Sequence, residues 1–344
     1  MSASQQAIAE ELGLSIATVS RSLRNHKGIN PQTRAKVLKT ASKLGYRLNS
    51  IRTTSGQKDP MVTIGVLVYG DASVTGASAV VTTRILEGIA EEARRVDAAL
   101  QLDYIPLALS HRIDEKEVQP VGLRNRLWQG SILVGHFGKE AVARFAQENI
   151  CVQVADYEPG IRVDCVDHDD ADSCELLVNH LWQQGHRQIG YLANSAYAAC
   201  RFSRYAGICG SLARRGVMVD HANILNLTGE NLSPEEAVVC VKQRLETGVS
   251  AWICENDFIG YKLIEQLRHL GLDCPGDLSI CGFDNLEPPS GLPKLTSIDA
   301  PFEEMGTMAV HRLMQRLNRD SLDVMHKMLT CRLINGESVK GASS

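Results

Sequence analysis

Long apolar runs are missing from this chain of 344 residues. No stretch of about 18 or more consecutive apolar residues occurs, so we expect no membrane-spanning helix. The opening residues, MSASQQAIAEELG, contain neither the basic segment nor the apolar segment of a secretory signal. We therefore expect a cytoplasmic protein with no membrane partner.

Cysteine pairs with the spacing of a metal or redox site are also missing. All ten cysteines lie at or after Cys151, and no two of them form a Cys-x-x-Cys pair. Several lie within apolar runs, such as Cys254 in AWIC and Cys281 in SICGF, as is typical of small buried side chains in a reducing compartment. We predict neither a metal site nor a cofactor, because the ligand spacings that they require are missing.

Acidic residues are nearly absent from the first 58 residues, which contain only Glu10 and Glu11 against ten lysines and arginines. This segment carries a net charge of +8 while the whole chain carries -4, so the remaining residues carry -12. A basic terminal segment on an acidic body predicts that the terminal segment meets a polyanion. A solvated basic face would give the same composition, and charge alone does not separate the two.

Three short helices are predicted within residues 4–45. Ser4 and Ser15 are suited to cap the first and second helices, and Gly13 to form the turn between them. Asn30-Pro31 opens the third helix and Gly45 ends it. Apolar residues recur at helical spacing: Ile8 and Leu12, then Val19 and Leu23, then Val37, Leu38, Ala41 and Leu44. The polar residues that follow have the composition of a linker.

From Met61 onward, short β-rich runs alternate with helical stretches. The predicted strands cover residues 62–68, 100–105, 131–135, 151–156, 188–193, 250–254 and 278–283. Continuous apolar strands that alternate with helices predict parallel sheets covered on both faces. The length of this region favours two α/β lobes over one.

The second predicted helix, SIATVSRSL, has the pattern of a DNA recognition helix. A helix that enters the major groove needs small or polar residues at its leading end and basic groups on the same face. Arg21 can donate two hydrogen bonds to a guanine edge. The predicted DNA contacts from this region are Ser15, Ile16, Ala17, Thr18, Ser20, Arg21, Arg24 and Asn25. A plain three-helix bundle is the alternative.

These segments together resemble the LacI/GalR family of bacterial repressors. The matching segments are 8–25, 30–34, 44–49, 64–68, 129–135, 166–170, 185–192, 204–207, 255–257, 277–284 and 292–299, in the family's order over nearly the whole chain. The resemblance implies a small all-α helix-turn-helix headpiece and a two-lobed α/β domain with parallel sheets, similar to a periplasmic binding protein. We expect the headpiece at 1–46, a hinge at 47–60 and the effector domain at 61–338. The expected lobes are 61–158 with 294–320, and 160–290 with 321–338.

The resemblance implies an effector site between the lobes. Ligands of open α/β sheets gather beyond the carboxyl ends of the strands, which agrees with this placement. The residues expected there are Asp71, Asp156, Arg204, Asn256, Asp257 and Asp284. Carboxylates, an amide and a guanidinium suit the hydroxyl groups of a sugar. An aspartate at a strand end can instead cap the next helix, and this alternative stays open for each of them.

The acidic residues between 164 and 172 have the side-chain types of a metal site. This stretch contains Asp164, Asp167, His168, Asp169, Asp170 and Asp172. In the family the equivalent segment is an ordinary loop that leads into a helix, and we expect the same here.

The linker departs from the family pattern Tyr-x-Pro-Asn-x-x-Ala-x-x-Leu. Asn49 matches, but Leu48 replaces the proline, Arg52 the alanine and Ser55 the leucine. Because the apolar wedge is missing, we expect weaker bending of operator DNA than by typical relatives, and a strong central kink in a bending assay would contradict this. Ile51 is the alternative wedge; otherwise Asn49 and Arg52 are expected to contact DNA from a flexible linker.

The sequence thus predicts a sequence-specific transcriptional regulator, expected to be a repressor, whose affinity for double-stranded operator DNA depends on a small molecule, expected to be a sugar. A homodimer would place two recognition helices about one helical turn apart. A tetramer stays open, although the tail offers no heptad repeat.

A sugar-binding protein without DNA function would not explain the basic segment. An enzyme would need a nucleophile elbow, a phosphate loop or a cofactor motif, and we find none.

Overall fold

The amino-terminal part of the chain contains two helices joined by a tight turn. The computed structural model describes residues 5–23, 30, 33, 36, 37, 40, 61–70, 77–157, 159–193, 198–227, 233–319 and 323–342. Helix α1 (Gln5–Leu12) and helix α2 (Ile16–Leu23) flank Gly13, whose φ of +61° is the left-handed conformation that glycine adopts without strain. Ile8, Val19 and Val37 are buried together. The predicted helix pair and its core are therefore confirmed.

The third predicted helix is described only in part. Thr33, Lys36, Val37 and Thr40 are helical. Ser4, Pro31, Leu38 and the whole predicted linker lie outside the described residues, so the predictions about hinge folding and DNA bending stay predictions.

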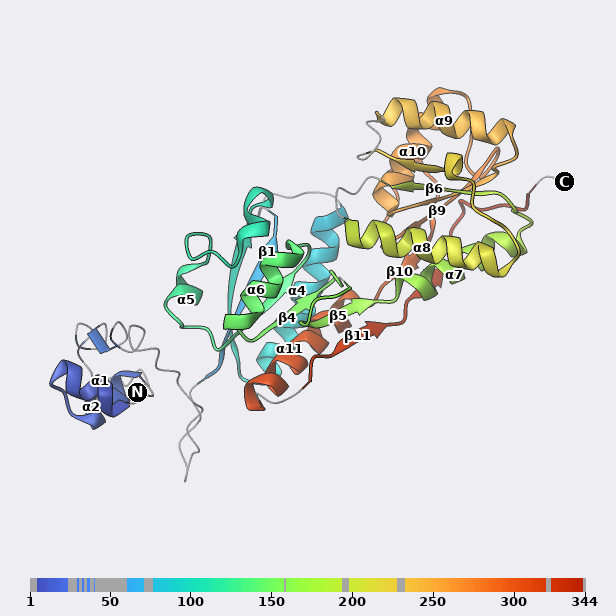
Figure 1. Ribbon diagram of the computed structural model, residues 1–344. Coiled ribbons are helices and arrows are strands. Elements are labelled where there is room, and N and C mark those ends of the chain that lie inside the picture. Colours follow the sequence, from blue (N-terminus) through green and yellow to red (C-terminus); the bar gives the residue numbers. More distant parts are fainter. Residues whose placement is uncertain are drawn as a thin grey trace.

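Two six-stranded sheets form the body of the molecule (Figure 1), as predicted. The first sheet has the order β11-β5-β4-β3-β1-β2, and all of its pairs are parallel. Its strands are β1 (Thr63–Tyr69), β2 (Ala99–Ile105), β3 (Gly130–Val134), β4 (Cys151–Val154), β5 (Asp164–His168) and β11 (His326–Leu329).

The second sheet has the order β12-β10-β9-β8-β6-β7 and is parallel except for the β10–β12 pair. Its strands are β6 (Ile189–Ala193), β7 (Ile224–Asn226), β8 (Ala251–Cys254), β9 (Ser279–Phe283), β10 (Thr296–Asp299) and β12 (Arg332–Ile334). All seven predicted strands are present within two residues of their expected bounds. Strands β5, β7, β10, β11 and β12 were not predicted.

Helices cover both faces of each sheet, as continuous apolar strands require. On the first sheet, α4 (Ala77–Arg95) and α11 (Phe302–Asn318) share one core with β1, while α6 (Lys139–Glu148) packs on the opposite face. On the second sheet, α7 (Asp170–Gln183) and α8 (Ala198–Arg214) lie on one side, and α9 (Pro234–Glu246) and α10 (Asp257–His269) on the other (Figure 1). The shorter helices are η1 (Leu107–Arg112), α5 (Val121–Arg124) and η2 (His221–Asn223).

The chain crosses between the lobes three times, which corrects the predicted lobe boundaries. The crossings connect β5 to α7, β10 to α11 and β11 to β12. Strands β5, β10 and β11 each belong to the sheet opposite to the one expected. The reason is that their partners are distant in sequence; His326 of β11, for example, pairs in register with Cys165 of β5. No local pattern reports such a pairing.

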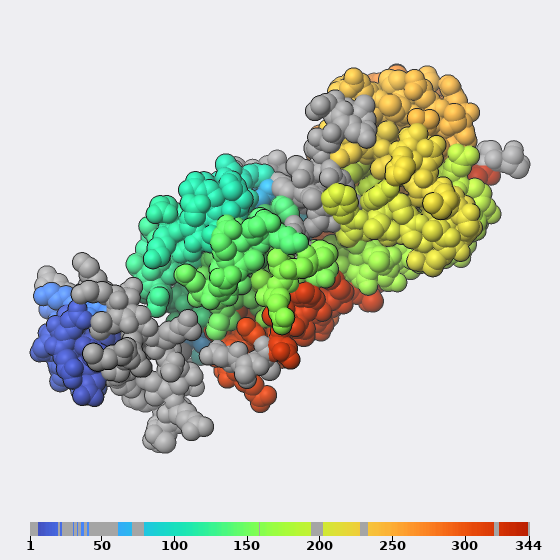
Figure 2. Space-filling model, viewed as in Figure 1, coloured from blue at the N-terminus to red at the C-terminus, as the bar shows by residue number. Residues whose placement is uncertain are grey.

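The carboxyl ends of the two sheets face each other across these crossings. All three crossings leave from the carboxyl end of a strand: β5 and β11 in the first sheet, and β10 in the second. Figure 2 shows the two lobes as separate bodies, with the C-terminal segment (red) running from the first lobe toward the second. The junction is therefore the place where ligands of open α/β sheets bind. Within the described part of the chain, no helix combines the length and apolar character of a membrane span.

Candidate functional site

Helix α2 presents its predicted DNA-contacting side to solvent. Ile16 is 50% exposed, and Ala17 and Arg21 are exposed as well, whereas Val19 and Ser22 are fully buried. Because residues three and four apart share a helix face, Ala17 and Arg21 lie on one side, next to Ile16 at the leading end. This arrangement offers a guanidinium and small apolar groups to a groove.

Two of the predicted DNA contacts are occupied in the cap of α2. The backbone N–H of Thr18 donates to Ser15 Oγ at 3.1 Å, and the two hydroxyl oxygens lie 2.8 Å apart. Ser15 therefore caps the helix, as predicted from the sequence. The backbone of Ser20 is helical, but its side chain is outside the described residues, as are Arg24, Asn25, Asn49 and Arg52.

Arg204, on α8, lies at the centre of the junction between the lobes. Only 5% of it is exposed. Its Nε donates to Asp170 Oδ1 at 2.9 Å, and its Nη1 donates to the carbonyl oxygen of Glu255. Its guanidinium carbon lies 4.0 Å from the centroid of the Phe283 ring. The guanidinium that we expected to hold a ligand is thus bound to groups of the protein itself.

His168, the last residue of β5, shares Asp170 with Arg204. Its Nε2 lies 3.0 Å from Asp170 Oδ1 and 3.1 Å from Arg204 Nη2, and its Nδ1 lies 2.9 Å from Asp167 Oδ1. Burial opposes protonation, but Asp170 and Asp167 outweigh it and raise the pKa of His168 well above 6.5. Burial likewise opposes ionisation of Asp170, but Arg204 and His168 lower its pKa overall. An ionised aspartate therefore lies between two cations.

Asp284 lies directly after β9, at the carboxyl end of the strand. Its φ of +93° and that of Asn285, +50°, put two successive residues in a region that side chains other than glycine rarely adopt. Its backbone N–H donates to Ile298 O at 2.8 Å, whereas its carboxylate forms no hydrogen bond or ion pair with any described residue. Burial raises the pKa of this carboxyl, and Arg204 and His168 act against that rise. Arg204 and Asp284 therefore lie near each other at the junction between the lobes.

Asn256 and Asp257 are engaged inside the second lobe. Asn256 Oδ1 accepts from the backbone N–H of Ile259 at 3.0 Å and caps α10. Asp257 is 0% exposed; its carboxylate accepts from Ser297 Oγ at 2.8 and 2.9 Å and from the N–H of Leu286 at 2.7 Å. Burial, followed by the charge of Asp284, raises the pKa of Asp257 well above its usual value. This placement argues against direct ligand contact by either residue.

Asp156 lies in the first lobe, at the end of β4. It accepts from Gln153 Nε2 at 2.6 Å and from the N–H of Phe137 at 3.3 Å, and His136 Nδ1 lies 2.7 Å from its other oxygen. The sequence did not single out His136, whose ring meets that of Tyr69 edge-on at 6.2 Å. Asp71 lies outside the described residues.

The sequence analysis missed three residues of the junction. His168 and Asp170 were assigned to a loop, and Asn285 was not considered although it follows Asp284 at the end of a strand. The Oδ1 of Asn285 is buried without a partner among the described residues. The segment VDHDD, which carries the family resemblance, could have pointed to His168 and Asp170, whereas Asn285 lies just after the matching segment 277–284.

The acidic stretch is not a loop, which corrects that expectation. Asp164 lies in β5 and binds Arg312 Nε at 2.7 Å and Arg316 Nε at 3.3 Å. Asp169 caps α7 by accepting from the N–H of Asp172 at 3.0 Å. Over the ranges that the structure describes, no group of three histidine, cysteine or acidic side chains is placed to hold a metal ion.

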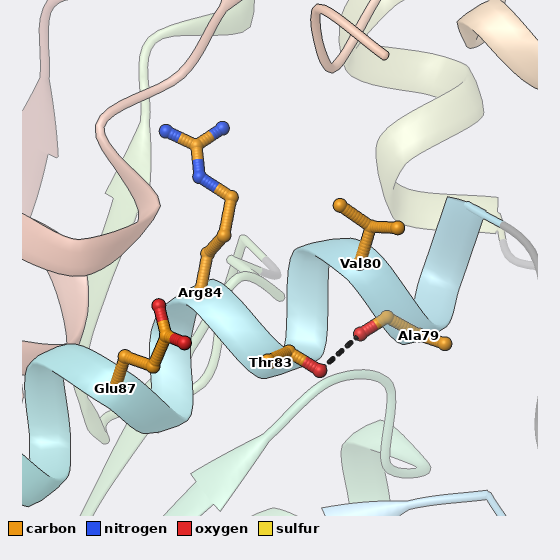
Figure 3. A pocket seen from close by; sticks show the side chains of 5 residues that line it. All are labelled: Ala79, Val80, Thr83, Arg84 and Glu87. Atoms are coloured by element: carbon orange, nitrogen blue, oxygen red, sulfur yellow. Dashed lines mark hydrogen bonds between the residues drawn. The ribbon is translucent and has the colours of Figure 1, made fainter. Parts of the chain in front are cut away.

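A shallow hollow of about 280 Å³ lies along α4. Figure 3 shows the five residues that line it, all from the same helix: Ala79, Val80, Thr83, Arg84 and Glu87. Its lining is mostly apolar and comes from one element. We do not regard it as the effector site, because the polar groups that converge do so at the lobe junction instead.

Comparison with known proteins gives two family matches. Residues 6–49 match the bacterial regulatory proteins of the lacI family, and residues 178–339 match the periplasmic binding protein-like domain. The regulator RegA of Clostridium saccharobutylicum is 27% identical, over 98% of this chain and 99% of its own.

Two solved structures share the fold over the whole length. The lac repressor dimer bound to operator and the anti-inducer ONPF has a TM-score of 0.68 at 20% identity, covering 99% of this chain and 100% of the other. The regulator CelR in complex with cellobiose has a TM-score of 0.67 at 20% identity, covering 97% and 99%. Both the headpiece and the paired lobes therefore have counterparts of known structure.

Proposed function

Because this chain belongs to the LacI/GalR family of DNA-binding transcriptional regulators, we propose that it is a repressor whose operator affinity is set by a sugar bound between its lobes. The relatives are regulators and not enzymes. Helix α2 is the element that reads base edges, through Arg21 and the small residues beside it. The ligand changes the relative arrangement of the lobes, and this changes the spacing of the two DNA-binding heads in a dimer.

The carboxylate of Asp284, which pairs with none of the described residues, is the observation that carries the effector proposal. It lies at the carboxyl end of β9, near Arg204 and His168, in a strained backbone conformation. Strain at a strand end is typical of functional sites. A sugar hydroxyl can donate to this carboxylate and accept from a neighbouring cation, which suits the mixed charges of the junction. The CelR–cellobiose complex shows that a protein of this fold can hold a sugar.

We predict that Asp284→Asn weakens effector binding while sparing the fold. A ligand that binds the native state raises the unfolding temperature, by about 5 °C at a concentration near 100 times its Kd. Cellobiose, glucose, glucosamine and adenosine are suitable probes in a thermal-shift screen. The variant should lose at least about tenfold in affinity for the sugar that shifts the wild type, because a charge-assisted hydrogen bond contributes about 1.5–3 kcal/mol.

Glu287→Gln is the matched control, since Glu287 lies in the same loop with its side chain 89% exposed. It should respond as the wild type does. An Asp284→Asn variant with unchanged affinity would show that the sugar binds elsewhere. A wild type that responds to adenosine and to none of the sugars would contradict the proposed ligand class.

The free edge of the first sheet supports a dimer. Strand β2 is the edge strand, and Leu100, Leu102 and Tyr104 are 37%, 45% and 38% exposed there. They lie opposite Ile64, Val66 and Val68 of β1, so they share the sheet face that α4 covers, and α4 contacts β2. An apolar row on an exposed edge strand is a liability unless something covers it. We propose that a second copy of the chain covers this pairing face, which consists of β2 and the outer side of α4.

We predict that the double substitution Leu102→Asp and Tyr104→Asp yields a monomer. Introducing charges into the centre of an apolar interface should weaken self-association by about 100-fold or more. Sedimentation equilibrium of the full chain measures this directly. Met218→Asp is the control, because Met218 is 87% exposed on the second lobe and outside the pairing face. A double variant that stays dimeric at wild-type concentrations would place the interface elsewhere.

A further inference from the structure

Arg84, on α4, binds to both lobes at once. Its Nε and Nη2 donate to the two carboxylate oxygens of Glu303 at 2.6 and 3.0 Å. Its Nη1 donates to Asp299 Oδ1 at 3.3 Å. Glu303 lies in α11 of the first lobe, whereas Asp299 is the last residue of β10 in the second sheet. The proposed function assigns no role to this arginine.

The same guanidinium reaches the segments where the chain crosses between the lobes. Asp299 begins one crossing and also binds Arg332 Nη2 at 2.9 Å, at the start of β12 on another. The guanidinium carbon of Arg84 lies 5.1 Å from the centroid of the Phe302 ring, which His168 meets edge-on at 6.2 Å. Arg84 is therefore connected to all three crossings, directly or through one neighbour. Figure 3 shows its guanidinium extending away from Ala79 and Thr83.

Helix α4 cannot move independently of α11. A Cβ added at Gly88 would lie 1.9 Å from the carbonyl oxygen of Glu303, and one at Gly306 would lie 2.2 Å from that of Ile85. The two helix backbones are thus in direct contact and belong to one rigid layer. The Arg84–Glu303 pair therefore lies within one layer, whereas the contact of Arg84 with Asp299 spans the two lobes and would change in any rearrangement of one lobe relative to the other.

We infer that Arg84 is a positioning residue that couples the arrangement of the lobes to α4, and through α4 to the pairing face and the DNA-binding heads. This inference rests on the proposed function. Two discrete arrangements of the lobes are needed for coupling, and an ion pair made in one of them biases the population toward it. Removing the pair shifts that population, so specific DNA affinity changes even though Arg84 does not touch DNA.

The test uses the full chain and a duplex enriched from a random library by the wild-type protein. Arg84→Met keeps the aliphatic stem and removes the guanidinium. The fold should survive, because Asp299 keeps Arg332 and the side chain of Glu303 is 47% exposed. We expect the Kd for the enriched duplex to change by about fivefold or more, within the usual range of allosteric coupling. Urea unfolding verifies that the variant is folded. Arg84→Lys keeps the positive charge but loses the planar guanidinium that donates from two nitrogens, so it should change the Kd by less than Arg84→Met does.

Arg214→Met is the matched control, since Arg214 lies in the second lobe, outside the pairing face, with its side chain 62% exposed. It should leave the Kd unchanged. Asp299→Asn should change the Kd in the same direction as Arg84→Met, although it also weakens the pair of Asp299 with Arg332. The double variant should change the Kd by less than the two single changes combined, because both substitutions break the Arg84–Asp299 contact. A merely structural role would lower stability in each variant without moving the Kd.

The outcomes separate the two proposals. If Arg84→Met binds the enriched duplex within about twofold of the wild type, the coupling role is overturned and the proposed function stands. If the changes in Asp299→Asn and Arg84→Met add in the double variant, Arg84 does not act through Asp299 and the inference is likewise overturned. If the wild type enriches no duplex, the proposed function fails and this inference fails with it.

Discussion

Arg21→Ala should remove specific operator binding and leave weak attachment to any duplex. Arg21 is exposed on the side of α2 that also presents Ile16 and Ala17. A guanidinium that donates two hydrogen bonds to a guanine edge contributes about 1–3 kcal/mol of discrimination, or roughly 5- to 150-fold in affinity. Attachment through phosphates depends on the total positive charge and falls with salt, so one arginine of many changes it little.

Fluorescence anisotropy with the enriched duplex and a scrambled duplex, at two salt concentrations, measures both the specific and the nonspecific affinity. The ratio of the two affinities should collapse toward one in Arg21→Ala, whereas affinity for the scrambled duplex should change by less than about threefold. Arg214→Ala removes an exposed arginine from the second lobe, outside the pairing face, and should preserve the ratio. An unchanged footprint on the enriched duplex would show that α2 is not the recognition helix.

Six of the seven predicted strands come from buried, continuous apolar runs, such as SILVG and AWIC, for which the sequence reports burial directly. The seventh, β2, is the half-exposed edge strand. Strand β5 was missed because its sequence, DCVDH, has only two apolar residues, which lie between carboxylates. Asp164 is buried there only because Arg312 and Arg316 arrive from α11, about 150 residues later. No local pattern contains that partner.

The residues of the site could be placed at the correct edge of the sheet but not in the correct orientation. The rule that ligands gather at strand ends selected Asp284, and the family resemblance selected Arg204, which the structure places near it. The same rule selected Asn256 and Asp257, which the structure engages in a helix cap and in buried hydrogen bonds. Whether a strand-end carboxylate faces a ligand depends on acceptors and donors from other elements; for Asp257 these are Ser297 and Leu286. Such partners are set by the tertiary fold.

Arg204→Ala should destabilise the whole protein and not only remove a ligand contact. The side chain is buried against Asp170, Glu255 O and the Phe283 ring. Removing one partner of a buried ion pair leaves the other charge uncompensated and costs about 3–5 kcal/mol. Urea unfolding of the full chain measures this. Arg214→Ala is the control, since Arg214 binds Glu175 with its own side chain 62% exposed and should cost less than about 1 kcal/mol.

The pH dependence of stability provides a second test of the same cluster. The pKa of Asp170 is lowered, so its contribution is complete above its unfolded value near 3.8 and is lost as pH falls through the lower folded value. The pKa of His168 is raised, so its contribution is complete below its unfolded value near 6.5 and is lost as pH rises through the higher folded value. In Arg204→Ala the imidazolium is the remaining cationic partner of Asp170. The cost of the substitution should therefore grow as pH rises through the raised folded pKa of His168, where the imidazolium loses its proton.

Because Arg204→Ala is expected to destabilise the fold, Asp284→Asn is the better substitution for measuring effector binding. A loss of ligand response in Arg204→Ala would have two causes, a missing contact and a weakened junction, and unfolding data would be needed to separate them. None of the described residues pairs with the carboxylate of Asp284, so Asp284→Asn removes the negative charge without breaking a described contact. If Arg204→Ala instead unfolds within about 1 kcal/mol of the wild type at every pH, its bonds to Asp170 contribute little to the fold, and Arg204 would then be free to exchange that carboxylate for a ligand oxygen.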